Sequence, residues 1–354
     1  MEKSPKKKWW RWGVNRWFIL LFIVGSIITA KMYSPVRPDV KLPAEKLSCS
    51  PILVLPKPYG DVPPEFCLEG AGEGKAPVIG LYLTNTMVAM FISDLILLLI
   101  GFGFYRYTKS GSLIPKGFSG AVEALLEVIY NLTQSTAGKW AKTVFPWFAT
   151  ITLLVLVSNW TELIPGVDSI GFLEKVKTGG SNVQQLTSGI STVIKSAKGT
   201  VPAGEGYVVV PFVRVVSTDL NFTVALALIA VVMVQITGIR AQGLGYFKKF
   251  WNTKTLFTKP IFGVIDFGVG LLELVSEFSK ILSFAFRLFG NIFAGSVLLF
   301  VIGSLVPVFA QTGFLMLEFF VGMIQAIVFG MLTMTFMAQA TQGHGGDHKE
   351  EAHA

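Results

Sequence analysis

Residues 283–296 read Ser-Phe-Ala-Phe-Arg-Leu-Phe-Gly-Asn-Ile-Phe-Ala-Gly-Ser and lie inside an apolar run from about residue 261 to residue 305. One cation, Arg287, stands in the middle of that run. A guanidinium stays protonated in proteins, and at the centre of a membrane helix it costs at least about 2.5–3.5 kcal/mol. Either a function or a buried structural ion pair must offset this cost, and charges inside membranes are functional by default.

Helical spacing places small and neutral side chains on the face of Arg287. Positions three, four and seven residues after it, and four before it, share this face. They are Gly290, Asn291, Ala294 and Ser283. The sequence therefore predicts a fixed positive charge on a nearly smooth surface, with the phenylalanines mostly pointing elsewhere. Small residues also let membrane helices pack closely, so close helix packing alone would explain Gly290 and Ala294.

The composition indicates an integral membrane protein. Of 354 residues, 52% are hydrophobic and 15% are charged, and several apolar runs reach the roughly 20 residues that cross a bilayer. The net charge of +8 arises from lysines and arginines in short connections, as the positive-inside rule expects, and does not indicate nucleic-acid binding. We predict an all-α polytopic membrane protein with about five core membrane helices plus an N-terminal anchor helix.

The N-terminal segment, residues 1–33, combines a basic start, several tryptophans and an apolar run at 17–30. Such a segment is either a cleaved signal peptide or an uncleaved signal anchor. Ile28 stands where cleavage needs a small residue, so we favour the anchor with a cytoplasmic N-terminus. Residues 34–80 are rich in proline and glycine and would then lie outside, where disulfides persist. Cys49 and Cys67 either pair there or remain thiols, since spacing says nothing about geometry.

Residues 81–341 form the predicted membrane domain. Its five core helices cover about residues 81–104, 145–164, 212–239, 261–305 and 314–337. An amphipathic helix within 117–139 is expected on the cytoplasmic surface or against a partner. The helix 261–305 would be roughly 65 Å long, about twice a hydrocarbon core. We therefore expect a long, strongly tilted helical hairpin at the C-terminal end, with a tight turn bracketed by Pro307 and Gly313.

The connections set the expected orientation. Residues 240–259 carry five basic residues and no acid, which predicts a cytoplasmic location. Residues 165–210 form a polar outer loop whose order is not readable from the sequence. Residues 342–354 hold all three histidines; a metal site is conceivable, but we expect a polar cytoplasmic tail.

Polar side chains in or beside the predicted helices form two sets, one on either side of Arg287. The outer set comprises Asn159, Glu162, Asp219, Ser296 and Glu318, and Asn221 lies near the same end of the helix that follows Asp219. The inner set, called the inner polar set below, comprises Glu273 and its neighbours Glu277 and Lys280. Glu277 and Lys280 are spaced to pair. Carboxylates, amides and hydroxyls along a membrane path are the groups that proton relays use. Two half-paths separated by a fixed cation would exchange protons through a moving partner that carries a carboxyl past the arginine.

The run Arg287-Leu-Phe-Gly-Asn291-Ile-Phe-Ala-Gly295, with Gln325 on the following helix, resembles subunit a of the F-type ATP synthase membrane sector, CF(0). Residues 159–165 and 218–221 also resemble the family, and the resemblance covers about residues 80–340. It implies a stator proton-channel subunit that couples hydrogen ion transport to ATP synthesis. The implied partners are a c-subunit ring, b-type peripheral stalk subunits and the F1 sector, in a bacterial cytoplasmic (inner) membrane.

The resemblance also implies roles for individual residues. Arg287 would be the stator arginine facing the c ring, Asn291 and Gln325 would line that interface, and Glu273 would belong to the cytoplasmic half-channel. Many bacterial members have an acid where this chain has Ser296 and a histidine where it has Glu318, so the acid has moved to the facing helix. Residues 1–80 and the tail are extra relative to the core family.

Other classes explain less of the sequence. A secondary transporter or another ion channel would account for the intramembrane charges, but transporters show internal repeats or broken helices, and no clear repeat is present. A structural scaffold would not need Arg287. An enzyme acting alone would need a phosphate-binding loop, a metal cluster or a nucleophile with a base. The sequence shows no such loop, no metal cluster in the predicted membrane helices and no such nucleophile. We predict no catalytic residue and no cofactor, and the choice between H⁺ and Na⁺ stays open.

Overall fold

The computed structural model describes most of the chain. The described residues are 17–28 except 22 and 26, 44–47, 53–54, 61–62, 76–77, 80–109, 117–164, 167–176, 181–187, 190–194, 206–249, 260–305 and 309–342. Cys49, Cys67 and the three histidines lie outside them, so the disulfide and the tail stay predictions. Within 17–28 the described residues are helical, and the anchor role stays a prediction.

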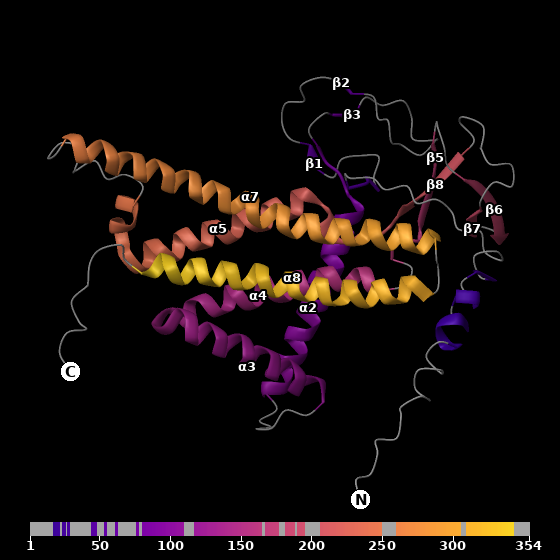
Figure 1. Cartoon of the computed structure of the whole chain (residues 1–354), viewed down its shortest axis with the longest axis horizontal. Coiled ribbons are helices and arrows are strands. Elements are labelled where there is room, and N and C mark those ends of the chain that lie inside the picture. The colour runs from indigo at the N-terminus through magenta and orange to yellow at the C-terminus, as the bar shows by residue number, and fades with distance from the viewer. Residues whose placement is uncertain are drawn as a thin grey trace, which may run out of the picture. The chain divides into compact units, whose positions relative to one another are not determined.

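Long helices make up most of the described chain (Figure 1). They are α2 (Asn85–Lys109), α3 (Phe118–Ala137), α4 (Ala141–Trp160), α5 (Leu220–Gln242), α7 (Pro260–Leu305) and α8 (Phe309–Thr341). Short 3-10 segments adjoin them: η1 (Gly138–Trp140), η2 (Thr161–Leu163), η3 (Val216–Thr218) and η4 (Gly243–Lys249). Among the described residues, 5 helical stretches are long and apolar enough to cross a membrane. The prediction of a polytopic helical membrane protein is confirmed.

The turn before the last helix is shorter than predicted. Helix α8 begins at Phe309, so Gly313 lies inside it rather than at the end of a turn. A single glycine costs a helix only about 1 kcal/mol relative to alanine, and the long apolar run that begins at Phe314 continues the helix. Gly313 was therefore a weaker stop signal than we assumed.

Four antiparallel strand pairs or hairpins complete the described elements. Strand β1 (Leu53–Val54) pairs with β4 (Gly80–Leu81), and β2 (Asp61–Val62) with β3 (Ala76–Pro77). Strand β5 (Gly171–Val176) pairs with β8 (Gly206–Pro211), with Gly171 opposite Pro211, and β6 (Asn182–Thr187) with β7 (Ile190–Ile194). Four of these strands lie in or next to the loop 165–210, whose order was not readable from the sequence.

The chain divides into two compact units. The first comprises Met1–Tyr82, Pro165–Val213 and Ala294–Phe320, and the second comprises Leu83–Ile164, Arg214–Phe293 and Val321–Ala354. Helices α7 and α8 each contribute to both. The strands β5 to β8 belong to the first unit, and most of the helical core belongs to the second.

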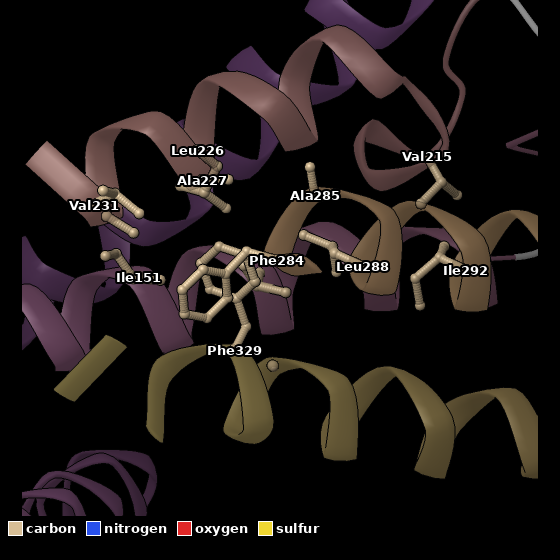
Figure 2. Packing of buried hydrophobic residues seen from close by; sticks show 13 residues of the cluster. Ile151, Val215, Leu226, Ala227, Val231, Phe284, Ala285, Leu288, Ile292 and Phe329 are labelled. Carbon is tan, nitrogen blue, oxygen red and sulfur yellow. The ribbon is translucent and has the colours of Figure 1, made fainter. Parts of the chain in front are cut away.

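The core of the second unit is an apolar cluster to which α4, α5, α7 and α8 all contribute (Figure 2). On α7 the fully buried members are Phe284, Ala285, Leu288 and Ile292. Figure 2 shows Phe284 directed toward Phe329 of α8, and their ring centroids are 5.0 Å apart. One side of α7 is thus fixed in the core, which determines the side on which Arg287 stands.

Glycines on α8 bring that helix close to α4. At Gly330 the place of a Cβ is taken by Thr152 Oγ1 and the Phe148 ring, and at Gly322 a Cβ would lie 3.2 Å from that of Asn159. Such small residues let membrane helices approach closely. Side chains of α4 therefore contact the backbone of α8 at two positions along the helices, Gly322 and Gly330.

Candidate functional site

Arg287 stands on an exposed side of α7. The five residues that helical spacing placed on one face are all exposed: Ser283, Arg287, Gly290, Asn291 and Ala294. Arg287 Nη2 donates to Ser283 Oγ at 3.5 Å, a contact at the limit of hydrogen bonding. Within the described part of the chain, no carboxylate lies within ion-pair distance of the guanidinium. The described residues therefore give no support to a buried structural ion pair.

The phenylalanines around Arg287 do not all point away from this side. Phe284 is 3% exposed, but Phe286 is 54% exposed. Phe286 directly precedes Arg287 and borders its face. The predicted smooth surface thus has one large apolar side chain at its edge.

Asn291 and Gln325 meet across α7 and α8. Asn291 Nδ2 donates to Gln325 Oε1 at 2.8 Å, and Gln325 is only 4% exposed. The Gln325 amide nitrogen donates to no atom in the described part of the chain. The structure therefore brings together the two amides that the sequence had placed on successive helices, one turn along α7 from Arg287.

Glu318 lies against α7 in the first unit. It is 6% exposed and Ser296 is 8% exposed. The Glu318 carboxylate occupies the space that a Cβ on Gly295 would need, and both of its oxygens would collide with that atom. The facing-helix acid thus contacts the residue next to Ser296, as expected if it replaces an acid at that position. Gly295 was named only as part of the motif, and its lack of a side chain is what admits the carboxylate.

Asn159 joins three segments of the second unit. Its Nδ2 donates to the carbonyl oxygen of Gly322 at 3.2 Å, and its Oδ1 accepts from Ser217 Oγ at 2.6 Å. Asn159 is 3% exposed and Glu162 is 8% exposed. Because both ends of the Asn159 amide are bonded within the protein, this residue positions α8 and η3. The sequence offered no signal for Ser217, which is 58 residues away.

Asp219 caps α5. Its Oδ1 accepts from the backbone N–H of Asn221 at 2.9 Å, and its Oδ2 accepts from Thr86 Oγ1 at 2.9 Å. A carboxylate at this position satisfies a backbone donor that the helix leaves unpaired. Asp219 therefore connects the first turn of α2 to the start of α5, while Asn221 is exposed.

The inner polar set forms around the first half of α7. Lys280 Nζ donates to Glu277 Oε1 at 2.8 Å, which confirms the pairing predicted from their spacing. Lys280 Nζ also lies 4.8 Å from the Phe336 ring centroid. Glu277 is 7% exposed, and Glu273 is partly buried.

Tyr246 adds a group that sequence reasoning missed. It lies on η4 and is 2% exposed. Burial, followed by the negative charges of Glu277 and Glu273, raises the pKa of the Tyr246 phenol to about 12. Its position in a short basic connection gave no periodic pattern from which its burial could be inferred.

The comparison of the sequence with protein families matches residues 87–338 to the family described as "ATP synthase A chain". The chain belongs to this family. ATP synthase subunit a from Moorella thermoacetica is 26% identical over 251 residues, which is 71% of this chain and 88% of the relative. ATP synthase subunit a from Campylobacter jejuni subsp. jejuni serotype O:23/36 (strain 81-176) is 30% identical over 243 residues, 67% and 84% respectively. The chloroplastic subunit a of Stigeoclonium helveticum is 30% identical over 237 residues, 65% and 75%.

Membership of the ATP synthase A chain family fixes the coarse role of the chain. It is a multi-pass, non-catalytic membrane subunit of the F-type ATP synthase complex. The transporter, unrelated channel and scaffold readings are therefore set aside. The matched range begins at residue 87, so the N-terminal extension falls outside it.

Proposed function

We propose that this subunit is the stator of the proton turbine, in which Arg287 separates two offset half-channels. The observation that carries the proposal is the two-sided character of α7. Phe284, Leu288 and Ile292 fix one side in the core, while Arg287 is exposed on the other among small residues. A membrane helix that displays an arginine in this way is suited to meet an acidic partner sliding past it.

The partner would be a ring of c subunits, each carrying one carboxyl group. At about 4 Å and an effective dielectric constant of 20, Arg287 would favour the ionised carboxylate by about 4 kcal/mol. Facing lipid, the same carboxyl must be protonated, because an unpaired charge there is expensive. Each carboxyl would thus release a proton on one side of the arginine and take one up on the other, which turns the ring in one direction.

The two sets of polar residues would supply the half-channels. The outer half-channel would be lined by Glu318, Ser296 and Glu162, with Asn159, Asp219 and Asn221 around them. The inner half-channel would involve Glu273 and Lys280. The amide pair of Asn291 and Gln325 would line the ring interface.

The proposed setting is a bacterial cytoplasmic membrane. The basic connection at residues 240–259 supports a cytoplasmic location for that loop, and an uncleaved anchor would place both termini there. The b-type stalk subunits and the F1 sector would complete the complex and carry out the ATP chemistry.

The test compares ATP-driven proton pumping in inverted membrane vesicles that contain wild-type or Arg287→Ala complexes. Arg106→Ala, which removes an exposed arginine at the end of α2, is the matched control. Both variants are first shown to assemble with the c ring. We expect Arg287→Ala to abolish pumping and Arg106→Ala to retain it. Unchanged coupled pumping in assembled Arg287→Ala complexes would overturn the proposal.

A further inference from the structure

The inner polar set contains one buried carboxylate that the proposed half-channel does not yet use. Glu277 is 7% exposed and lies ten residues before Arg287 on α7. A buried carboxylate is strongly unfavourable unless it is paired. Lys280 provides that pairing through a contact of 2.8 Å, and the side chain of Lys280 is 20% exposed. Lys280 is thus more exposed than the carboxylate with which it pairs.

Tyr246 lies on η4, directly after α5, and neighbouring residues of α5 fix its position. The backbone reverses after α5 at Gly243, whose φ of 63° favours glycine. The Tyr246 ring then lies on Gly238, where a Cβ would come within 2.8 Å of Tyr246 Cζ. The Tyr246 hydroxyl donates to Gln235 Oε1 at 2.7 Å. Both a missing side chain and a hydrogen bond thus fix the ring in place.

The negative charge of Glu277 contributes to the raised pKa of the Tyr246 phenol. Of the two carboxylates that raise the pKa of the Tyr246 phenol, Glu277 contributes more than Glu273. The Tyr246 phenol therefore lies close enough to Glu277 to respond to its charge, while the Lys280 ammonium, which lies over the Phe336 ring, pairs with the Glu277 carboxylate. The Glu277 carboxylate is thus buried and has one adjacent cation.

We propose that Glu277 is a proton-exchanging carboxylate of the inner half-channel, buried in the protein and paired with Lys280. The inference rests on the proposed function. During synthesis, a ring carboxyl would lose its proton, the Glu277 carboxylate would accept it, and Glu277 would then release it to the cytoplasm. Each step moves one proton between oxygen atoms and needs no other reactant. Glu273, which is less buried, would lie nearer the exit.

The competing reading is that Glu277 and Lys280 form an ion pair that only stabilises the fold. Breaking such a pair by removing one partner leaves an uncompensated buried charge, whereas replacing both partners is often tolerated. A comparison of single and double variants therefore separates the two readings. The variants are Glu277→Gln, Glu277→Asp and the double variant Glu277→Gln with Lys280→Met, and the control is Glu123→Gln, an exposed glutamate on α3.

The measurement is passive proton flux through the membrane sector of assembled complexes in vesicles stripped of F1. We expect Glu277→Gln to lower the flux at least tenfold, Glu277→Asp to restore part of it, and Glu123→Gln to leave it unchanged. The double variant should stay as slow as Glu277→Gln. Wild-type flux in Glu277→Gln, or recovery of flux in the double variant, would overturn the inference. The Arg287→Ala experiment tests the turbine proposal separately. If Arg287→Ala abolishes pumping while a Glu277 variant gives either of these contrary results, only the role of Glu277 is refuted.

Discussion

Gly295→Ala tests whether the position of the Glu318 carboxylate matters for proton transfer. In the wild-type chain this carboxylate fills the space beside the bare Cα of Gly295. A methyl group there would overlap both carboxylate oxygens, so the carboxylate must move or α7 and α8 must separate. Gly268→Ala adds the same methyl group to the same helix where no atom lies within 4 Å, and is the matched control.

The expected size of the effect follows from the cost of overpacking. Forcing a methyl group into a filled site typically costs about 1–3 kcal/mol. Because the displaced group is the far end of a flexible side chain, the cost lies near the lower end of that range, and at about 1.4 kcal/mol for each tenfold change the wild-type position of Glu318 becomes about fivefold less populated. If protons enter through Glu318 in that position, the rate of ATP-driven pumping should fall by a similar factor. Gly268→Ala should pump at the wild-type rate.

Pumping is measured in inverted vesicles with equal amounts of assembled complex. Adding Glu318→Asp to Gly295→Ala shortens the acid by one methylene and should recover part of the rate. If assembled Gly295→Ala complexes pump normally, the reasoning that ties proton entry to the packing of Glu318 is wrong. If the single variant is slow and the double variant is slower still, the space beside Gly295 is not the cause.

Two further predictions concern the edges of the site. Asp219→Ala removes the cap of α5 and the acceptor for Thr86, so it should destabilise the complex by about 0.5–2 kcal/mol, seen as a lower melting temperature in detergent. Asp219→Asn keeps an oxygen that accepts from the Asn221 N–H, and its amide nitrogen can donate to Thr86 Oγ1 in place of the present bond, so it should retain the melting temperature. Loss of pumping in Asp219→Asn at normal stability would instead indicate a role in proton transfer. The pKa of Tyr246 lies near 12 rather than 10.0, so the folded state holds this proton more tightly than the unfolded state. The associated stability is complete below pH 10 and is lost as the pH rises toward 12. Tyr246→Phe should therefore lose less stability than the wild type between pH 10 and pH 12, and parallel losses would contradict the assignment.

The sequence predicted those features that depend on a single helix. The extent of α7, the common face of Arg287 and Asn291, and the pairing of Glu277 with Lys280 all follow from helical periodicity within one segment. Exposure is different, because it depends on which neighbours cover a helix. The phenylalanines were expected mostly to point away from the arginine face, and helical spacing alone did not show that Phe284 would be buried in the core while Phe286 stays exposed.

The remaining features depend on contacts between distant segments. Asn159 is held by Ser217 and by Gly322, which is 163 residues away, and no local pattern encodes such a pairing. Strands β5 and β8 pair across about 30 residues, and short β-branched runs separated by polar stretches give little signal for their register. Tyr246 is buried because η4 folds back on Gly238, which also cannot be read from a one-dimensional pattern.

The close packing of α8 on α4 has a mechanical consequence. Gly322 and Gly330 seat α8 against Asn159 and Thr152 at two separate levels, and α8 in turn packs on α7 through Phe284 and Phe329. A rotor pushing sideways on Arg287 would load this stack of helices. Because α8 contacts α4 at two separate positions, its rotation relative to α4 is restricted, whereas a single contact would leave α8 able to rotate about that contact. Larger residues at Gly322 and Gly330 should weaken the packing of α8 on α4, so that α7 and Arg287 are held less rigidly. Part of the force from the rotor would then deform these helices instead of driving rotation.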